Sequence, residues 1–391
     1  MKNPWGDVTG IRPVKIARTT LGSGKTEKDF VDMFTNELNV SEEKTQLTLN
    51  IAVREMNILK NYKKNDICLY IGVPFCKTRC LYCSFVTNSA AKNSKYMRPF
   101  VKNLKTEIEY TADLLKKTDY NIVGLYFGGG TPTTLSAMDL EDVINKCYES
   151  FDLTNLVEFT VEVGRPDTID REKLETLKKC GVTRISINPQ TMNDNILKVI
   201  GRAHTVEDIY ESFSLARECG FDNINMDIIA GLPTETFEEF QNSVNLVTKL
   251  EPECITVHTM SIKRGSVLHE KLGDYALTDE KVVSQMVDYS INKLTELKYF
   301  PYYLYRQKHM VGDFENIGYS KEGKECLYNI MIMEETNSIV SMGCGGVSKI
   351  VNLPNDRIER VFNVKEAKDY VERIDEMLHR KDVILDWLNL R

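Results

Sequence analysis

Short apolar runs alternate with amphipathic helical segments through the middle of this 391-residue chain. A strand-like run followed by a helical pattern is typical of a βα unit, and successive βα units form a parallel sheet with right-handed crossovers. The strand-like runs fall at 67–73, 122–127, 156–163, 183–188, 223–229 and 254–259. The helical segments that separate them fall at about 95–117, 136–149, 170–180, 205–219 and 236–250. This pattern predicts an α/β fold with a partial (β/α)6 barrel of the TIM type.

The pattern differs on both sides of this repeat. Residues 1–60 are predicted to be a polar lead-in followed by a helix over about 41–59. Beyond about residue 270 a C-terminal α+β extension is predicted, without a flexible linker before it. It would contain a helix at 278–298, an aromatic run at 302–305, strand-like pieces at 327–333 and 338–342, and a helix at 365–380. The predicted domains are therefore 1–60, 61–270 and 271–391.

Charge and hydropathy exclude several classes of protein. Lys and Arg number 50 against 57 Asp and Glu, and the net charge of -7 does not suit a general nucleic-acid binder. No apolar run approaches the roughly 18–20 residues that cross a bilayer, so no membrane partner is expected. The first residues lack the apolar core of a signal peptide, which predicts a cytoplasmic protein.

Three of the ten cysteines lie within eight residues, and the other seven are scattered. Cys76, Cys80 and Cys83 have the spacing C-x3-C-x2-C and follow the first strand directly. Thiolates are soft ligands that suit zinc or an iron–sulfur cluster. Three cysteines cannot complete a tetrahedral zinc site, but they can hold a cubane cluster with one iron left for another ligand. Buried or zinc-binding cysteines remain the alternative.

The triplet, with Tyr82 before its last cysteine, resembles the signature of the radical S-adenosylmethionine (SAM) superfamily. The context Tyr70-Ile-Gly-Val-Pro-Phe-Cys76 resembles the oxygen-independent coproporphyrinogen III oxidase group. Further stretches resemble the HemZ-type coproporphyrinogen dehydrogenases over nearly the whole chain. They are Pro4-Trp5-Gly6, Thr9-Gly-Ile-Arg-Pro13, Glu162-Val-Gly-Arg-Pro-Asp167, Asn188-Pro-Gln-Thr-Met-Asn193 and Tyr303-Leu-Tyr-Arg-Gln-Lys308. Members of that group usually carry a further region before the Pro-Trp-Gly stretch, which this chain is expected to lack.

The resemblance implies a [4Fe-4S] cluster and SAM as cofactors, with Cys76, Cys80 and Cys83 as the cluster ligands. In such enzymes an electron from the cluster splits the sulfonium bond of SAM, and the protein orients and shields the cofactors. The implied SAM contacts are Tyr70, Tyr82, Gly129, Gly130, Thr131, Glu162, Gln190, Arg202, Asp227 and Ser261. Their residue types fit: glycines let the backbone approach a small zwitterion, and a guanidinium pairs with a carboxylate. Structural alternatives, such as a tight turn or an ion pair, remain open for each.

The implied activity is that of a radical SAM oxidoreductase of porphyrin and haem biosynthesis. It would convert coproporphyrinogen III to protoporphyrinogen IX by oxidative decarboxylation and would need an electron donor that the sequence does not identify. A tetrapyrrole with four propionates calls for cations near the barrel mouth. The candidates are Arg165, Lys263, Arg264 and Arg306, with Tyr302, Tyr303 and Tyr305 as possible walls and surface charge or packing as the alternative.

Two positions differ from the pattern of the oxidases, which resemble C-x3-C-x2-C-x-C and carry a histidine four residues before the first cysteine. Here those positions are Phe85 and Gly72. Relatives with the shorter form include proteins that bind or deliver haem. The second hypothesis is therefore a haem chaperone, with His258 or His309 as a possible iron ligand. A third is a radical SAM enzyme that modifies another tetrapyrrole.

Overall fold

The computed structural model describes residues 3–84, 88–306, 314–354 and 357–388. Contacts between residues divide the chain into two compact units, each built from several stretches. The first unit contains residues 1–63, 190–196 and 226–334, and the second unit contains 64–189, 197–225 and 335–391. These units follow proximity in space rather than order in the chain. The three consecutive domains expected from the sequence stay a prediction.

The sheet of the second unit is mostly parallel. Its strands lie in the order β13-β12-β11-β1-β4-β5-β6, followed by the first residues of β7. They are β1 (Asp66–Val73), β4 (Asn121–Gly129), β5 (Glu158–Gly164), β6 (Arg184–Ile187), β11 (Ile339–Gly343), β12 (Val347–Ile350) and β13 (Glu359–Phe362). Strands β1, β4, β5 and β6 run parallel, β11 adds to β1 in parallel, and β12 and β13 are antiparallel. Nearly every residue of β1 and β4 is buried, as in a sheet covered by helices.

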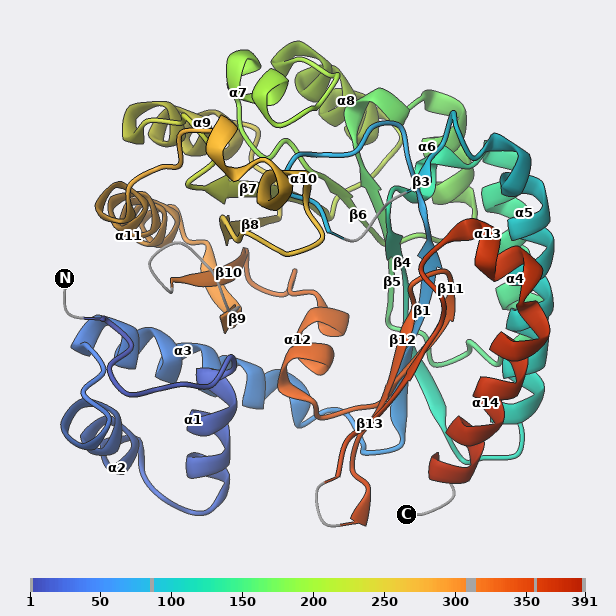
Figure 1. Ribbon diagram of the computed structural model, residues 1–391. Helices are drawn as coiled ribbons and strands as arrows, with labels where there is room; N and C mark the ends of the chain where they lie inside the picture. The colour runs from blue at the N-terminus through green and yellow to red at the C-terminus, as the bar shows by residue number, and fades with distance from the viewer. Residues whose placement is uncertain (1–2, 85–87, 307–313, 355–356, 389–391) are drawn as a thin grey trace. The chain divides into compact units, whose positions relative to one another are not determined.

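Helices of the second unit follow their strands as the βα pattern predicts. They are α4 (Ser94–Leu115), α5 (Ala137–Ser150), α6 (Arg171–Lys179), α8 (Val206–Glu218), α13 (Ala367–Glu372) and α14 (Ile374–Leu388). Helices α4, α5 and α6 lie along one face of β1, β4 and β5, and α13 and α14 pack on α4 (Figure 1). Several begin at a side-chain cap; Ser136, for example, accepts a hydrogen bond from the Asp139 amide at 3.1 Å. The short elements are β2 (Phe75–Cys76), β3 (Asn88–Ser89), η2 (Pro132–Thr134) and η3 (Pro166–Thr168), and α7 (Asp194–Val199) begins in the first unit.

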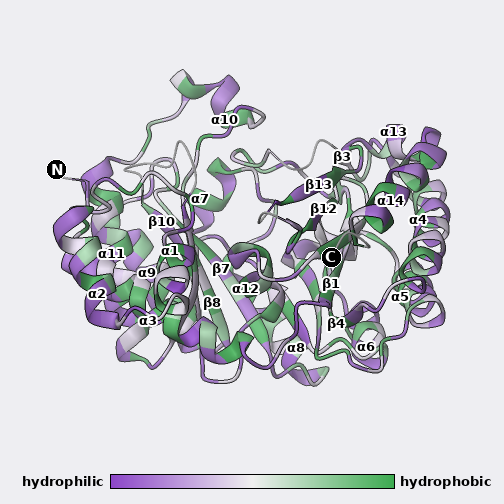
Figure 2. Ribbon diagram, turned by 90° about the horizontal axis from the view of Figure 1, so that it is seen from below, coloured by the Kyte–Doolittle hydropathy of each residue, from purple (hydrophilic) through white to green (hydrophobic). Residues whose placement is uncertain are grey.

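The first unit combines the remaining βα elements with the N-terminal segment 1–63 and with the residues that follow β8, up to residue 334. Its strands lie in the order β7-β8-β10-β9, with β10 antiparallel to both neighbours. They are β7 (Ile224–Ala230), β8 (Cys254–Thr259), β9 (Phe300–Arg306) and β10 (Glu315–Ser320). The helices are α1 (Pro13–Gly22), α2 (Glu27–Asp32), η1 (Met33–Glu37), α3 (Glu42–Leu59), α9 (Phe237–Lys249), α10 (Val267–Glu270), η4 (Leu272–Asp274), α11 (Glu280–Glu296) and α12 (Leu327–Glu334). Helices α4 and α11 each carry purple and green stretches in Figure 2, as amphipathic helices do.

The six predicted strands and the five helices between them are all present, with ends shifted by a few residues. The α/β class with a mostly parallel sheet in an open order is therefore confirmed. None of the helices in the described part of the chain is long and apolar enough to cross a membrane.

Two predicted elements are wrong. Residues 327–333 are not a strand but helix α12. The run Leu-Tyr-Asn-Ile-Met-Ile-Met is almost wholly apolar, so its periodicity does not distinguish a helix from a strand. The lead-in over residues 1–40 is not merely polar; it forms α1, α2 and η1 around Trp5, Phe30 and Phe34, which are fully buried. The Phe30 and Phe34 ring centroids lie 4.3 Å apart, so these two side chains pack against each other within the segment.

Candidate active site

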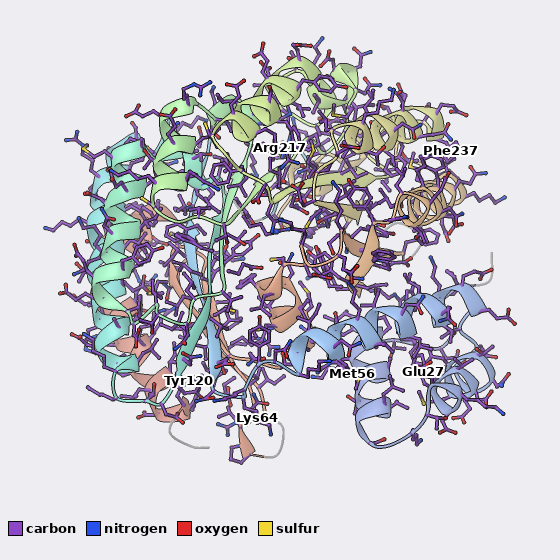
Figure 3. All side chains as sticks on the ribbon, turned by 180° about the vertical axis from the view of Figure 1, so that it is seen from behind. Glu27, Met56, Lys64, Tyr120, Arg217 and Phe237 are labelled. Carbon is purple, nitrogen blue, oxygen red and sulfur yellow. The ribbon has the colours of Figure 1, made fainter. Side chains whose placement is uncertain are left out.

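The carboxyl ends of the parallel strands in the second unit carry most of the predicted site residues. Figure 3 labels Lys64 and Tyr120, which precede β1 and β4 and lie at the same edge of the sheet. The carboxyl ends of these strands lie at the opposite edge, where βα loops form the active sites of parallel barrels. Tyr70, the cysteine triplet, the glycine run and Glu162 all lie at or just beyond that edge.

The cysteine loop begins in β2, at Cys76. The Cys76 carbonyl accepts a hydrogen bond from Ala90 N at 2.8 Å, and its Sγ lies 3.4 Å from Thr131 Oγ1. Cys83 N donates to the Cys80 carbonyl at 3.1 Å, which turns the end of the loop. Burial is the largest cause that raises the pKa of the Cys76 thiol to about 11; charge on Cys80 and Cys83 adds to the rise, and the Thr131 hydrogen bond opposes it. The three thiols are therefore close enough to influence one another.

The donor set of this loop fits a cluster in its chemistry. All three cysteines are free thiols, and Arg165 Nη1 lies 3.7 Å from Cys80 Sγ, where a cation stabilises thiolate charge. Within the described ranges, no three His, Cys, Asp or Glu side chains stand in a finished metal-ligand arrangement. The role of Cys76, Cys80 and Cys83 as cluster ligands stays a prediction.

The glycine run at the end of β4 is pressed against the segment that leads to the cysteines. Gly129 has a φ of 107°, and a Cβ on Gly130 would lie 2.5 Å from the Phe75 carbonyl oxygen. Gly130 N donates to Val73 O at 2.7 Å, and Thr131 N donates to Phe75 O at 2.8 Å. The run therefore lets the backbone of β4 approach the cysteine loop closely. Gly129, Gly130 and Thr131 as SAM contacts stay a prediction.

Two tyrosines and a carboxylate lie side by side on β1, β4 and β5. The Tyr70 and Tyr126 rings stack with centroids 5.9 Å apart, and Tyr126 Oη donates to Glu162 Oε1 at 2.6 Å. Burial and the Glu162 charge both raise the pKa of Tyr70, so its hydroxyl stays a donor. Sequence reasoning missed Tyr126, and the available signal was its position on β4 two residues before Gly128. In the structure, a Cβ on Gly128 would lie 3.1 Å from the Glu162 carboxyl.

Arg202 reaches the cysteine loop from the segment between α7 and α8. Its Nη1 donates to the Asn188 carbonyl at 2.6 Å, and its guanidinium also hydrogen-bonds Tyr82 and Cys80. Burial raises the pKa of the Tyr82 hydroxyl, as does charge on Cys80. This contact places two predicted SAM residues, Tyr82 and Arg202, beside the triplet.

Arg165, predicted as a substrate contact, is buried against the same loop. Its guanidinium donates to both Asp167 oxygens at 3.0 and 3.2 Å, to Thr78 O at 3.0 Å and to Thr78 Oγ1 at 2.9 Å. It is 2% exposed. These contacts hold Arg165 against the cysteine loop. Arg165 as a substrate contact stays a prediction.

Gln190 and Asp227 meet in the first unit. Gln190 has a φ of 70°, and its backbone brackets Asp227: Gln190 N donates to Asp227 O, and Ile229 N donates to Gln190 O, both at 2.9 Å. Asp227 Oδ2 lies 3.7 Å from His258 Nε2 on β8. The buried Ser261 follows that strand, and its hydroxyl has no partner among the described atoms. Gln190, Asp227 and Ser261 as SAM contacts stay a prediction.

The remaining substrate-side candidates separate into two groups. Lys263 and Arg264 lie in the loop after β8, half-buried and exposed, so they stay candidates. Arg306 is buried: its Nη1 donates to Val8 O at 2.7 Å, and its guanidinium lies over the Trp5 ring at 5.2 Å. Arg306 as a substrate contact stays a prediction.

Strand alternation also separates the three tyrosines. Tyr303 and Tyr305 stack with centroids 6.3 Å apart on one face of β9. Burial is the main cause that raises the pKa of both hydroxyls, and the Asp227 charge adds to it. For Tyr303, charge on Tyr305 also raises the pKa. Tyr302 shares the other face with Arg306. His309 lies outside the described residues.

Comparison with known proteins shows the family of this chain. A family model described as the Radical SAM superfamily matches residues 70–247. The oxygen-independent coproporphyrinogen-III oxidase-like protein HemZ of Bacillus subtilis is 40% identical over 380 residues, which are 96% of this chain and 76% of that protein. The heme chaperone HemW of the same organism is 30% identical over 312 residues, 78% of this chain and 76% of that protein.

Among solved structures, the coproporphyrinogen III oxidase HemN from Escherichia coli, described as a radical SAM enzyme, matches with a TM-score of 0.63. It is 23% identical and covers 84% of this chain and 73% of its own. This likeness shows the fold. The chain belongs to the radical SAM superfamily, in the group of oxygen-independent coproporphyrinogen-III oxidase-like proteins represented by HemZ.

Proposed function

We propose that this protein is a radical SAM enzyme that holds a [4Fe-4S] cluster and decarboxylates coproporphyrinogen III oxidatively to protoporphyrinogen IX. The observation that carries the radical SAM part is the contact between Cys76 and Thr131, which joins the cysteine loop to the glycine run. The tetrapyrrole part is supported by the likeness to HemZ over nearly the whole chain. A cytoplasmic location and an external electron donor complete the proposal.

The residues of each unit have separate tasks in this proposal. In the second unit Cys76, Cys80 and Cys83 hold the cluster, while Arg165 fixes the loop between them through Thr78. When bound, the cluster and SAM would together supply a carbon radical able to remove a hydrogen atom from a propionate side chain. Loss of CO2 and transfer of one electron to a one-electron acceptor would then leave the vinyl group.

The polar side chains around the cysteine loop are proposed to orient SAM. Glu162 is held by Tyr126 and accepts from the SAM amino group, and Arg202 binds its carboxylate. In the first unit Gln190 and Asp227 bind the ribose, Ser261 adds a hydroxyl, and Lys263 and Arg264 offer cations to substrate propionates.

Anaerobic incubation with SAM, a reductant and coproporphyrinogen III tests the proposal. The expected products are 5′-deoxyadenosine, CO2 and a porphyrinogen with two vinyl groups, each measured by mass spectrometry. Deoxyadenosine without a vinyl product would keep the radical SAM class and remove the substrate. S-adenosylhomocysteine in its place would indicate methyl transfer to another tetrapyrrole.

A haem chaperone is the second candidate, and the 30% identity to HemW over most of the chain favours it. His258 would be an iron ligand within the described residues, because its side chain is 28% exposed. This function predicts a Soret band that is lost in His258→Ala, with no turnover of coproporphyrinogen III. Failure to form any haem complex would remove it.

A further inference from the structure

Gln190 stands in a backbone conformation that needs support. Its φ of 70° is uncommon for a residue other than glycine, and such conformations persist where the surroundings fix them. The backbone bonds to β7 fix one side of this corner. The other side depends on the next residue, Thr191, which is fully buried.

A buried hydroxyl and carboxyl network lies under Thr191. Thr191 Oγ1 donates to Glu235 Oε1 at 2.7 Å and lies 3.2 Å from Ser243 Oγ. Ser243 Oγ in turn accepts from Met192 N at 2.9 Å and donates to Glu239 O at 3.1 Å. Glu235 follows β7 in the loop before α9, so the network ties the Gln190 corner to two elements of the first unit.

Glu235 itself is an unusual group for this position. It is 3% exposed, and its Oε2 is buried without a hydrogen-bond partner. No ion pair of Glu235 exists among the described residues, and the charged group that acts on it, Glu239 on α9, has the same sign. The loop at Thr278 contributes only a hydroxyl, 3.4 Å from the Glu235 carbonyl.

An ionised carboxylate is costly in such surroundings. Burial, helped by Glu239, raises the pKa of Glu235 to about 8, against the lowering effect of the Thr191 and Leu232 hydrogen bonds. At neutral pH the group is therefore an uncharged acid that accepts from Thr191. Above pH 8 it becomes an unpaired anion.

We infer that Glu235 is a positioning residue for SAM: its buried carboxyl holds Thr191, and through Thr191 it fixes Gln190 and the adjoining Asp227 backbone. This inference rests on the proposed function, because it takes Gln190 and Asp227 as SAM contacts. Glu235 touches neither cofactor nor substrate and acts through the corner alone.

Calorimetric titration of the reconstituted protein with SAM between pH 6.5 and 9.5 tests the inference. The wild type should lose affinity above pH 8, by about tenfold one pH unit above the pKa if only the uncharged form binds. Glu235→Gln, which keeps an acceptor and cannot ionise, should match the wild type at pH 7 within about twofold and lack that loss. Glu235→Leu should bind about tenfold more weakly at every pH. Glu238→Gln, at an exposed position on α9, is the matched control and should follow the wild type.

Two results would overturn the inference. One is a Glu235→Gln profile that falls with pH as the wild type does. The other is Glu235→Leu binding SAM as the wild type does while the protein is folded.

A wild type that binds no SAM at any pH would instead remove the proposed function. Hydrogen exchange of residues 189–196, which needs no SAM, then still decides the positioning. Glu235→Leu should speed exchange in that segment relative to the wild type at pH 7, and Glu235→Gln should not. Equal exchange in all three proteins would overturn the inference.

Discussion

At the scale of single residues, the Cys80 thiol lies next to two cations, because Arg165 and Arg202 both direct a guanidinium toward it. Cys80→Ala should leave a folded protein that lacks the broad cluster absorbance near roughly 400 nm after anaerobic reconstitution. Cys219→Ala, in a half-buried cysteine beyond α8, should keep it. An unchanged spectrum in Cys80→Ala would contradict its assignment as a ligand.

Glu55 is a residue that no sequence pattern singles out, and both of its carboxyl oxygens are buried without partners. Burial raises its pKa well above the usual value, and the charge of Glu334 adds to the effect. The folded state therefore holds a proton that the unfolded state releases above about pH 4.5, and stability falls as the pH rises through that window, by about 1.4 kcal/mol per pH unit for this one group.

Glu55→Gln should remove that slope and raise the melting temperature at pH 8. Thermal unfolding of both proteins at pH 5 and pH 8 measures it, with Glu42→Gln at an exposed position of the same helix as control. A difference between wild type and Glu55→Gln that is the same at both pH values would contradict the raised pKa.

How far the site could be predicted also depends on the residue. The three cysteines lie within eight residues and the glycines are consecutive, so spacing together with the family resemblance predicted their roles. Arg165 and Arg306 were predicted as substrate-side cations with packing as the alternative, and nothing in the sequence shows their hydrogen bonds to Thr78 and Val8. Glu235 was missed because the hydroxyl that donates to it, on Thr191, lies 44 positions away in the chain.

At the scale of elements, the strands and helices of the βα units follow their apolar periodicity, and their ends follow local caps, so sequence predicted them well. The helix α12 shows the limit, because an almost wholly apolar run carries no clear period. Long-range pairing is a second limit. The parallel contact of β11 with β1 joins residues about 270 positions apart, and no local pattern encodes it.

The pairing of β9 with β10 depends on one glycine. Gly318 faces Tyr303 across the two strands, and a Cβ there would lie 1.9 Å from the tyrosine ring. Gly318→Ala should destabilise the protein by about 1–3 kcal/mol, the usual cost of overpacking. The double variant Gly318→Ala, Tyr303→Ala should be more stable than the sum of the single effects predicts, by about 1 kcal/mol or more. Strict additivity in urea unfolding would contradict the clash.

At the scale of the whole molecule, the chain completes its second unit only with its last segment, since residues 335–391 supply β11 beside β1 and the helices against α4. A buried ion pair fixes this closure: Lys381 Nζ lies 3.0 Å from Glu107 Oε1, and the two side chains are 1% and 0% exposed. Glu107 also accepts from Gly343 N at 2.8 Å, from Asn363 Nδ2 at 2.7 Å and from the Tyr370 hydroxyl.

Removal of the cation should therefore loosen the closure of the whole unit. Lys381→Met leaves the Glu107 carboxylate buried without its counter-charge, and such a loss costs about 3–5 kcal/mol of unfolding free energy. Glu107→Gln together with Lys381→Met removes both charges and should recover most of that loss, because a neutral amide still accepts from Gly343. Lys368→Met, at an exposed position of α13, is the matched control and should be nearly neutral. Because Gly343 pairs with Gly72, four residues before Cys76, the single variant should also speed hydrogen exchange in the segment that leads to the cysteine loop. A Lys381→Met protein as stable as the control would show that the ion pair does not hold the C-terminal segment in place.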